Sequence, residues 1–108
     1  MNLVVTARFK RDSKPLAKKY RSLPDELEAL FESLESNPTQ GTPLGKDCYK
    51  IRLAIASKGR GKSGGGKVIT CVKVEQDNIY LLTIYDKSEK EDLKANELGE
   101  ILEEEGLE

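Results

Sequence analysis

The spacing of hydrophobic positions in the first half of the chain predicts one strand and two helices. Residues 2–9, NLVVTARF, open with an apolar, β-branched run that favours a strand. Residues 10–20 are basic and weakly helical, with Pro15 in the first turn of the expected helix. The clearest helix lies between Ser22 and Asn37. Four apolar residues recur there at the spacing of one helix face, namely Leu27, Leu30, Phe31 and Leu34.

The second half of the chain predicts a loop, three consecutive strands and a last helix. Residues 37–46 have the composition of a loop. The strands are expected over residues 48–56, 67–75 and 79–87. The third is apolar on both faces, which favours a central position in the sheet. Ser88 and Glu91 have the spacing of a capping box and predict a helix over 88–105. Its apolar stripe consists of Ala95, Leu98, Ile101 and Leu102.

This order of elements predicts an α+β fold in a single domain, residues 1–108. Strand 48–56 alternates strictly, so that one of its faces is apolar and the other carries Lys50 and Arg52. The apolar face consists of Tyr49, Ile51, Leu53 and Ile55. The two early helices are expected to cover this apolar face, which leaves the face with Lys50 and Arg52 open to solvent.

The net charge of −1 conceals a strong segregation of charge along the chain. Residues 8–21 and residues 46–67 each carry seven cations against one acid, whereas residues 89–108 carry nine acids against two lysines. Local fields of this kind decide what binds where, although each charged run can also be a solvated face. We expect the acidic last helix to cover Leu82 and Ile84 with its apolar stripe and to shield part of the basic face.

The composition also bears on cofactors and on the compartment. Cys48 and Cys71 are the only cysteines and the chain has no histidine, so we expect no metal site. No apolar run approaches 18 residues and no hydrophobic signal segment follows Met1, which predicts a cytoplasmic protein.

The stretch KGRGKSGGGKVIT, residues 58–70, combines glycines and cations in a way that suggests phosphate binding. The P-loop pattern fails because Ala56 stands where its first glycine is needed. Gly59, Gly61 and Gly64 spell G-x-G-x-x-G, but a strand pattern follows where a dinucleotide site requires a helix. We therefore expect a basic loop between two strands and no cofactor.

A hairpin that pairs Ala56 with Lys67 would place four cations on the open face. In this register Lys50 faces Lys73 and Arg52 faces Cys71, and Lys67 completes the row. Lys50 and Arg52 alone would be typical of the solvent-exposed face of a half-buried sheet. Four cations beside a basic loop instead favour a polyanionic binding partner, and nucleic acid above all. The same register separates Cys48 from Cys71 by roughly 13 Å along the strands, which predicts two free thiols.

Two stretches, DCYKIRLAIASKGRGKSGGGKVIT and NIYLLTIYDKSEKEDL, resemble the toxins of the RelE/ParE superfamily, and its HigB-like branch most of all. The resemblance covers residues 46–94 in motif and the whole chain in element order. It implies a compact RelE-like domain with a curved, mainly antiparallel sheet and metal-independent cleavage of mRNA, usually in the ribosomal A site. It also implies a cognate antitoxin, often a small helix-turn-helix protein, that masks the basic face.

The resemblance also implies roles for individual residues. Lys50 and Arg52 match the strand cations that contact the scissile RNA, and Lys67 stands where relatives usually carry arginine. Arg60 and Lys62 match the basic loop of these relatives, and Lys87 matches the cation after the third strand. With Lys58 of the same loop and Lys73 of the open face, Arg60 and Lys62 are the expected RNA-binding cations. Lysine at position 67 cannot make the bidentate phosphate contact of arginine, and the C-terminal tyrosine of some relatives is absent, with Lys94 close to its place.

Cleavage without a metal ion or histidine requires attack of a 2′-OH on the neighbouring phosphate. We assign charge stabilisation to Arg52 and Lys67, the general base to Lys50, and acid assistance to Lys87 or Tyr85. A non-catalytic binding module remains the alternative, either a ParE-like gyrase inhibitor or a degenerate toxin kept as an antitoxin-bound repressor. The Lys50 and Arg52 pattern favours RNA cleavage, because gyrase-directed relatives generally lack it.

Overall fold

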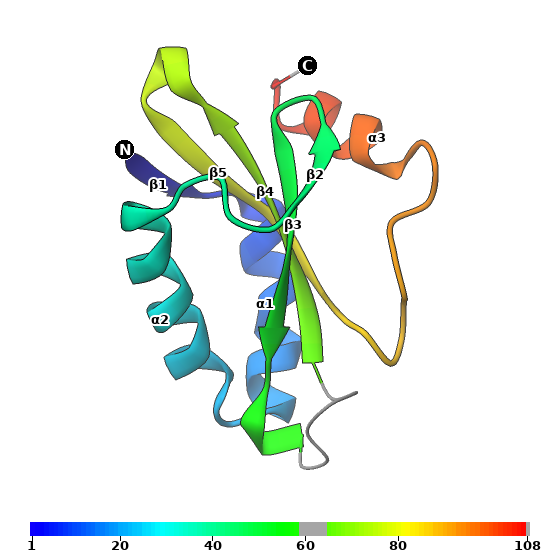
Figure 1. The fold of residues 1–108 in the computed structure, drawn as a ribbon. Helices are drawn as coiled ribbons and strands as arrows, with labels where there is room; N and C mark the ends of the chain where they lie inside the picture. The colour runs from blue at the N-terminus through cyan, green and yellow to red at the C-terminus, as the bar shows by residue number, and fades with distance from the viewer. Residues whose placement is uncertain (59–64, 108) are drawn as a thin grey trace.

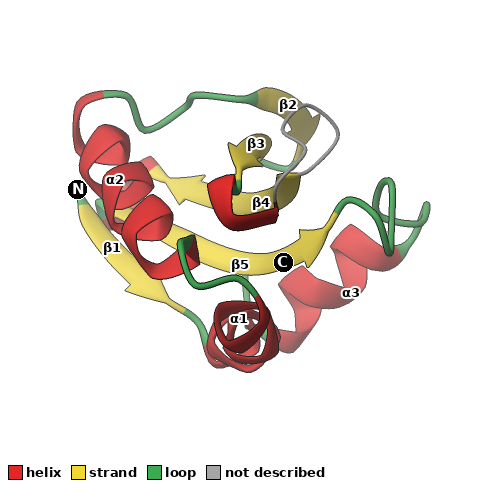
Figure 2. Ribbon diagram, turned by 90° about the horizontal axis from the view of Figure 1, so that it is seen from below, coloured by secondary structure: helices red, strands yellow, loops and turns green. Residues whose placement is uncertain are grey.

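The computed structural model describes residues 1–58 and 65–107, and its centre is a five-stranded mixed sheet (Figure 1). The strands are β1 (Asn2–Val5), β2 (Thr42–Gly45), β3 (Cys48–Ala54), β4 (Gly65–Lys73) and β5 (Asn78–Asp86). Their order across the sheet is β1-β5-β4-β3-β2, with β1 parallel to β5 and the other neighbours antiparallel. Figure 2 shows the bend of β5 within this curved sheet. The predicted α+β architecture with a curved, mainly antiparallel sheet is confirmed.

Three α-helices bury apolar residues on both faces of the sheet, and two short 3₁₀ helices, η1 (Ala56–Lys58) and η3 (Val74–Gln76), follow β3 and β4. The α-helices are α1 (Ala7–Lys19), α2 (Leu23–Ser36) and α3 (Glu97–Glu104). The helices α1 and α2 pack on the face that contains Ile51 and Leu53, as predicted. Helix α3 packs on the opposite face, where Ile101 and Leu102 meet Leu82. None of these three helices is long and apolar enough to cross a membrane.

The first strand is shorter than the predicted range of residues 2–9, and the first helix starts earlier. Strand β1 ends at Val5, because the Thr6 hydroxyl accepts a hydrogen bond from the Phe9 amide at 3.1 Å and so caps α1. The same hydroxyl donates to the Leu81 carbonyl of β5 at 2.7 Å. Pro15 consequently lies inside α1 and not in its first turn. The cap at Thr6 outweighs the β-branched pattern that precedes it.

The predicted loop at residues 37–46 contains the short edge strand β2, which pairs with β3. The turn between them places Lys46 and Asp47 at φ values of 55° and 66°. Two successive residues of positive φ form the tight turn that suits a hairpin. A four-residue edge strand needs few apolar residues, so composition alone did not reveal it.

The register of the β3–β4 hairpin differs from the prediction by four residues, because each β3 residue pairs with a β4 residue four positions earlier than expected. Arg52 pairs with Lys67, and Cys48 pairs with Cys71. The shift is even, so the cations stay on the predicted face. The two cysteines are free and buried, as expected, but they lie directly opposite each other and not 13 Å apart. The cause is Gly65 and Gly66, which belong to β4, where a Cβ would lie 2.7 Å from the Leu53 carbonyl oxygen and 3.0 Å from that of Tyr85.

The last helix is much shorter than the predicted 88–105, and no capping box forms. The amide and hydroxyl of Ser88 both donate to Asp86 Oδ1, at 2.9 and 2.8 Å, and so hold a turn after β5. Ile84, expected beneath this helix, belongs to the opposite core. Helix α3 therefore covers the part of the supposedly open face around Cys48 and Cys71, and only the part near Arg52 remains open.

Candidate functional site

The candidate site is a cavity of about 350 Å³ lined by residues before β2 and on β2, β3 and β4. The residues that line it are Gly41, Thr42, Lys50, Arg52 and Lys67. Lys50 and Arg52 point to this side because the alternating residues of β3 are buried in the core on the other side. Lys67 joins them because the observed register places it opposite Arg52. Three of the five residues assigned to catalysis from the sequence thus line one cavity.

A carboxylate that the sequence analysis missed connects two of these cations. Asp92 Oδ1 accepts hydrogen bonds from Lys50 Nζ at 2.7 Å and from Lys67 Nζ at 3.2 Å. Lys67 Nζ also donates to the Glu91 carbonyl oxygen at 2.7 Å. The hydrogen bonds from Lys50 and then Lys67 lower the pKa of Asp92 below its usual value. The only signal in the sequence was the acidic run around Asp92, which was assigned to a helix.

Arg52 differs from the two lysines in its exposure and its contacts. Its side chain is exposed to solvent, whereas Lys67 is 8% exposed. Within residues 1–58 and 65–107, no carboxylate forms an ion pair with Arg52. Its guanidinium is therefore available to an external anion, and it can bind a phosphate through two parallel hydrogen bonds.

Tyr85 lies next to this cluster, because it is the β5 partner of Lys67 in the sheet. Its side chain is buried, and its hydroxyl is one of few buried polar atoms of the described residues that have no hydrogen-bond partner. Burial, followed by the charges of Asp92, Glu97 and Glu91, raises the pKa of Tyr85 to about 12. The phenol is consequently protonated at neutral pH.

Lys87 is half-buried one residue beyond β5, where its amide donates to the Gly65 carbonyl.

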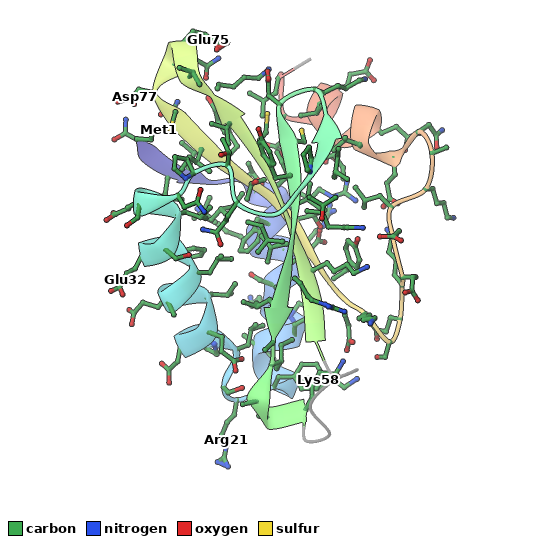
Figure 3. All side chains as sticks on the ribbon, viewed as in Figure 1. Met1, Arg21, Glu32, Lys58, Glu75 and Asp77 are labelled. Atoms are coloured by element: carbon green, nitrogen blue, oxygen red, sulfur yellow. The ribbon has the colours of Figure 1, made fainter. Side chains whose placement is uncertain are left out.

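Lys58, which was expected to bind RNA, is instead part of a buried ion pair at the far end of β3 (Figure 3). Its ammonium lies 2.6 Å from Asp86 Oδ1, and Asp86 Oδ2 accepts a hydrogen bond from the Tyr20 hydroxyl at 2.7 Å. Burial alone would raise the pKa of Asp86, but the hydrogen bonds from Lys58, Tyr20 and Ser88 outweigh it and hold the pKa well below its usual range. This arrangement joins α1, the end of β3 and the end of β5.

Among the other predicted RNA-binding cations, Lys73 belongs to the described residues, and it does not line the cavity. Lys73 lies six residues along β4 from Lys67, roughly 20 Å away at 3.3 Å per residue, and its ammonium is 3.4 Å from Asp47 Oδ2. Arg60 and Lys62 lie outside the described residues. Among those that are described, no group of three or more His, Cys, Asp or Glu side chains could hold a metal ion.

Comparisons with known proteins bear on the fold. No family model matches the chain. The free-state structure of E. coli toxin RelE, in a mutant with two arginines replaced by alanine, matches with a TM-score of 0.60 and 19% sequence identity. The match covers 83% of this chain and 86% of that toxin chain. The two chains therefore share a fold at low sequence identity.

Proposed function

We propose that this chain is the toxin of a type II toxin–antitoxin pair and that it inhibits translation by cutting mRNA on the ribosome. The observation that carries the proposal is the pairing of Arg52 with Lys67 beside Lys50, in a cavity on the solvent side of a sheet whose fold matches that of a bacterial toxin. Three cations converging on one cavity suit a phosphodiester, since phosphate contacts supply much of the affinity for nucleic acid.

The reaction we propose is attack of a 2′-OH on the adjacent phosphate, with loss of its proton to solvent water and cleavage of the P–O5′ bond, which leaves a 2′,3′-cyclic end and a free 5′-OH. Negative charge develops on the phosphorane oxygens, and the guanidinium of Arg52 and the ammonium of Lys67 are placed to stabilise it. The phenol of Tyr85 holds its proton at neutral pH and is a donor for the departing 5′-oxygen, with Lys87 as the second candidate.

Lys50 was assigned the role of general base from the sequence. The structure instead pairs its ammonium with the Asp92 carboxylate at 2.7 Å. We therefore propose that Lys50 binds phosphate by its charge. With no strong base in the cavity, fast cleavage depends on a partner that aligns the RNA, which favours the ribosome as that partner.

The proposed partners follow from this reaction: mRNA in the ribosome, and a cognate antitoxin, which we propose to be a small helix-turn-helix protein that covers the cationic cavity. The proposed place of action is the cytoplasm. Assignment to the HigB-like branch rests on the motifs of residues 46–94.

The test compares Arg52→Ala with Arg21→Ala during expression in bacteria, at matched levels of soluble protein. Arg21 is a suitable control because it loses the same charge, and Figure 3 shows its side chain directed away from the molecule. We expect Arg52→Ala to reduce cleavage of translated mRNA, measured by primer extension, by about 10²-fold or more, whereas Arg21→Ala cleaves like the wild type.

Equal cleavage by both variants would remove Arg52 from the site. Intact mRNA with stalled DNA replication in cells that express the wild type would refute RNA cleavage and support the gyrase inhibitor.

A further inference from the structure

The segment between β5 and α3, residues 87–96, lies against the candidate site and is called the strap below (Figure 1). It contains no helix or strand. Both of its ends are tied to neighbouring elements, by Ser88 to Asp86 and by the Lys94 amide to Glu97 Oε1 at 2.9 Å. Between these ends, Asp92 and the Glu91 carbonyl contact the two lysines of the cavity.

The Asp92 carboxylate has the contacts that a phosphate oxygen would need at this position. A single oxygen, Oδ1, accepts hydrogen bonds from both Lys50 and Lys67. A non-bridging phosphodiester oxygen carries the same charge and prefers the same donors at similar distances. The position between the two ammonium groups holds one oxygen, so a phosphate oxygen and Asp92 Oδ1 exclude each other there.

The strap also limits access to two groups that the proposed reaction requires. Lys67 is 8% exposed and Tyr85 is 9% exposed, although both belong to the cluster that should meet RNA. The buried Tyr85 hydroxyl has no partner in the described residues, which is unusual for a phenol in a protein interior. The ammonium of Lys90, a residue of the strap, lies 5.4 Å from the centre of the Tyr85 ring, so this side chain is next to the strap. Moving the strap would expose an ammonium and a phenol together.

Asp92 can leave the two lysines at low cost when a phosphate takes its place. Its side chain is 52% exposed and that of Lys50 is 25% exposed, so solvent screens this ion pair and the pair is weak. The Lys67 side chain is only 10% exposed, so its ammonium needs a replacement anion, which the phosphate supplies. Leu93 adds a partly buried apolar contact to the cluster beneath α3. The closed state is thus favoured in the free protein without being locked.

We propose that Asp92 occupies the phosphate site in the free protein, and that a phosphodiester of the RNA displaces this carboxylate and opens the strap when it binds. This inference rests on the proposed function. It makes the free toxin a weaker binder of RNA than its cations alone would allow, because the open form is only part of the population.

The first experiment measures binding of a short 2′-O-methyl oligoribonucleotide, which cannot supply the attacking 2′-OH, by fluorescence anisotropy. The variants are Asp92→Asn and, as the matched control, Glu91→Gln. The control removes one negative charge from the adjacent residue, whose contact with Lys67 is made by its backbone carbonyl. We expect Asp92→Asn to bind roughly three- to tenfold more tightly than Glu91→Gln, which is the range for loss of two exposed ion pairs. Equal affinity of the two variants would overturn the proposal.

The second experiment follows amide hydrogen exchange in the wild-type protein, with and without the oligonucleotide. We expect exchange in residues 87–96 to become faster when the oligonucleotide binds, while exchange in β3 becomes slower. Slower exchange in the strap would mean that RNA binds above a closed strap, which would overturn the inference.

Cleavage assays distinguish a failure of this inference from a failure of the proposed function. Asp92→Asn is expected to retain cleavage of translated mRNA, since Asp92 only occupies the site. A variant that binds more tightly but no longer cleaves would make Asp92 a participant in the reaction and would refute its role as an occupant. A wild-type protein that opens its strap on binding but never cuts mRNA would contradict the proposed function alone.

Discussion

Two aspartates of this protein hold lysines at short distances, and they differ mainly in their burial. Asp86 pairs with Lys58 at 2.6 Å, and the two side chains are 0% and 9% exposed. Asp92 is 52% exposed and pairs with Lys50 at 2.7 Å and with Lys67 at 3.2 Å, whose side chains are 25% and 10% exposed, so the exposed partner here is the carboxylate. Hydrogen-bond length therefore does not distinguish the two pairs.

The difference in burial gives the two pairs different uses. A buried charge that loses its partner stays uncompensated, so the Lys58–Asp86 pair must be kept for the fold to persist. A solvent-exposed pair can exchange its partner for water or for another anion at low cost. The pair at the candidate site is the replaceable one, which is what a binding site for an external phosphate requires.

The largest effect is expected from removing the buried carboxylate. Asp86→Ala removes the carboxylate that pairs with the Lys58 ammonium and accepts from the Tyr20 hydroxyl, and it leaves the ammonium with the Gly65 carbonyl at 3.3 Å. We expect it to lower the free energy of unfolding by about 3–5 kcal/mol, measured by urea denaturation. The double variant Lys58→Met with Asp86→Leu should recover part of this loss, because it buries no unpaired charge. A loss of unfolding free energy no larger than that of an exposed ion pair, about 0–1 kcal/mol, would mean that burial does not distinguish the two aspartates.

The buried pair also predicts how stability depends on pH. Because the pKa of Asp86 in the folded protein lies below its value of about 3.9 in the unfolded chain, the carboxylate contributes its full stability above about pH 4. This contribution is lost as the pH falls toward the pKa of the folded state. The difference in unfolding free energy between wild type and Asp86→Asn should therefore narrow below about pH 4. A difference that stays constant from pH 7 to pH 2 would contradict the assigned ion pair.

The same contrast explains how much the sequence could predict. The strict alternation along β3 was sufficient to place Lys50 and Arg52 on the face opposite the core, because the period of a strand depends only on local residues. The β3–β4 register could not be predicted from this alternation alone, because it depends on whether Gly65 and Gly66 belong to the loop or to β4. Their composition favoured the loop, whereas close approach of neighbouring strands places them in β4.

Contacts between distant segments lay beyond sequence patterns. Asp92 is 42 residues from Lys50 and lies in a segment with no periodicity to indicate its direction. We predicted that acidic C-terminal residues lie near the basic face, and Asp92 does so. The predicted helix was wrong, because Asp92 belongs to the strap, which consists of turns and bends. Lys58 was predicted to bind RNA because no residue near it in the sequence indicated an ion pair with Asp86, which lies 28 residues later.

The smallest effect is expected from Asp92→Asn on stability, and it completes the comparison. The variant loses two ion pairs, but solvent already screens the Asp92 carboxylate, and the amide can still accept a hydrogen bond from either lysine. We expect its urea midpoint to match that of Glu91→Gln at low salt and at high salt, even though the two variants differ in RNA affinity. A destabilisation close to that of Asp86→Ala would show that the strap is part of the structural framework. In that case both aspartates would serve the fold, and a phosphate could not displace Asp92 without partly unfolding the protein.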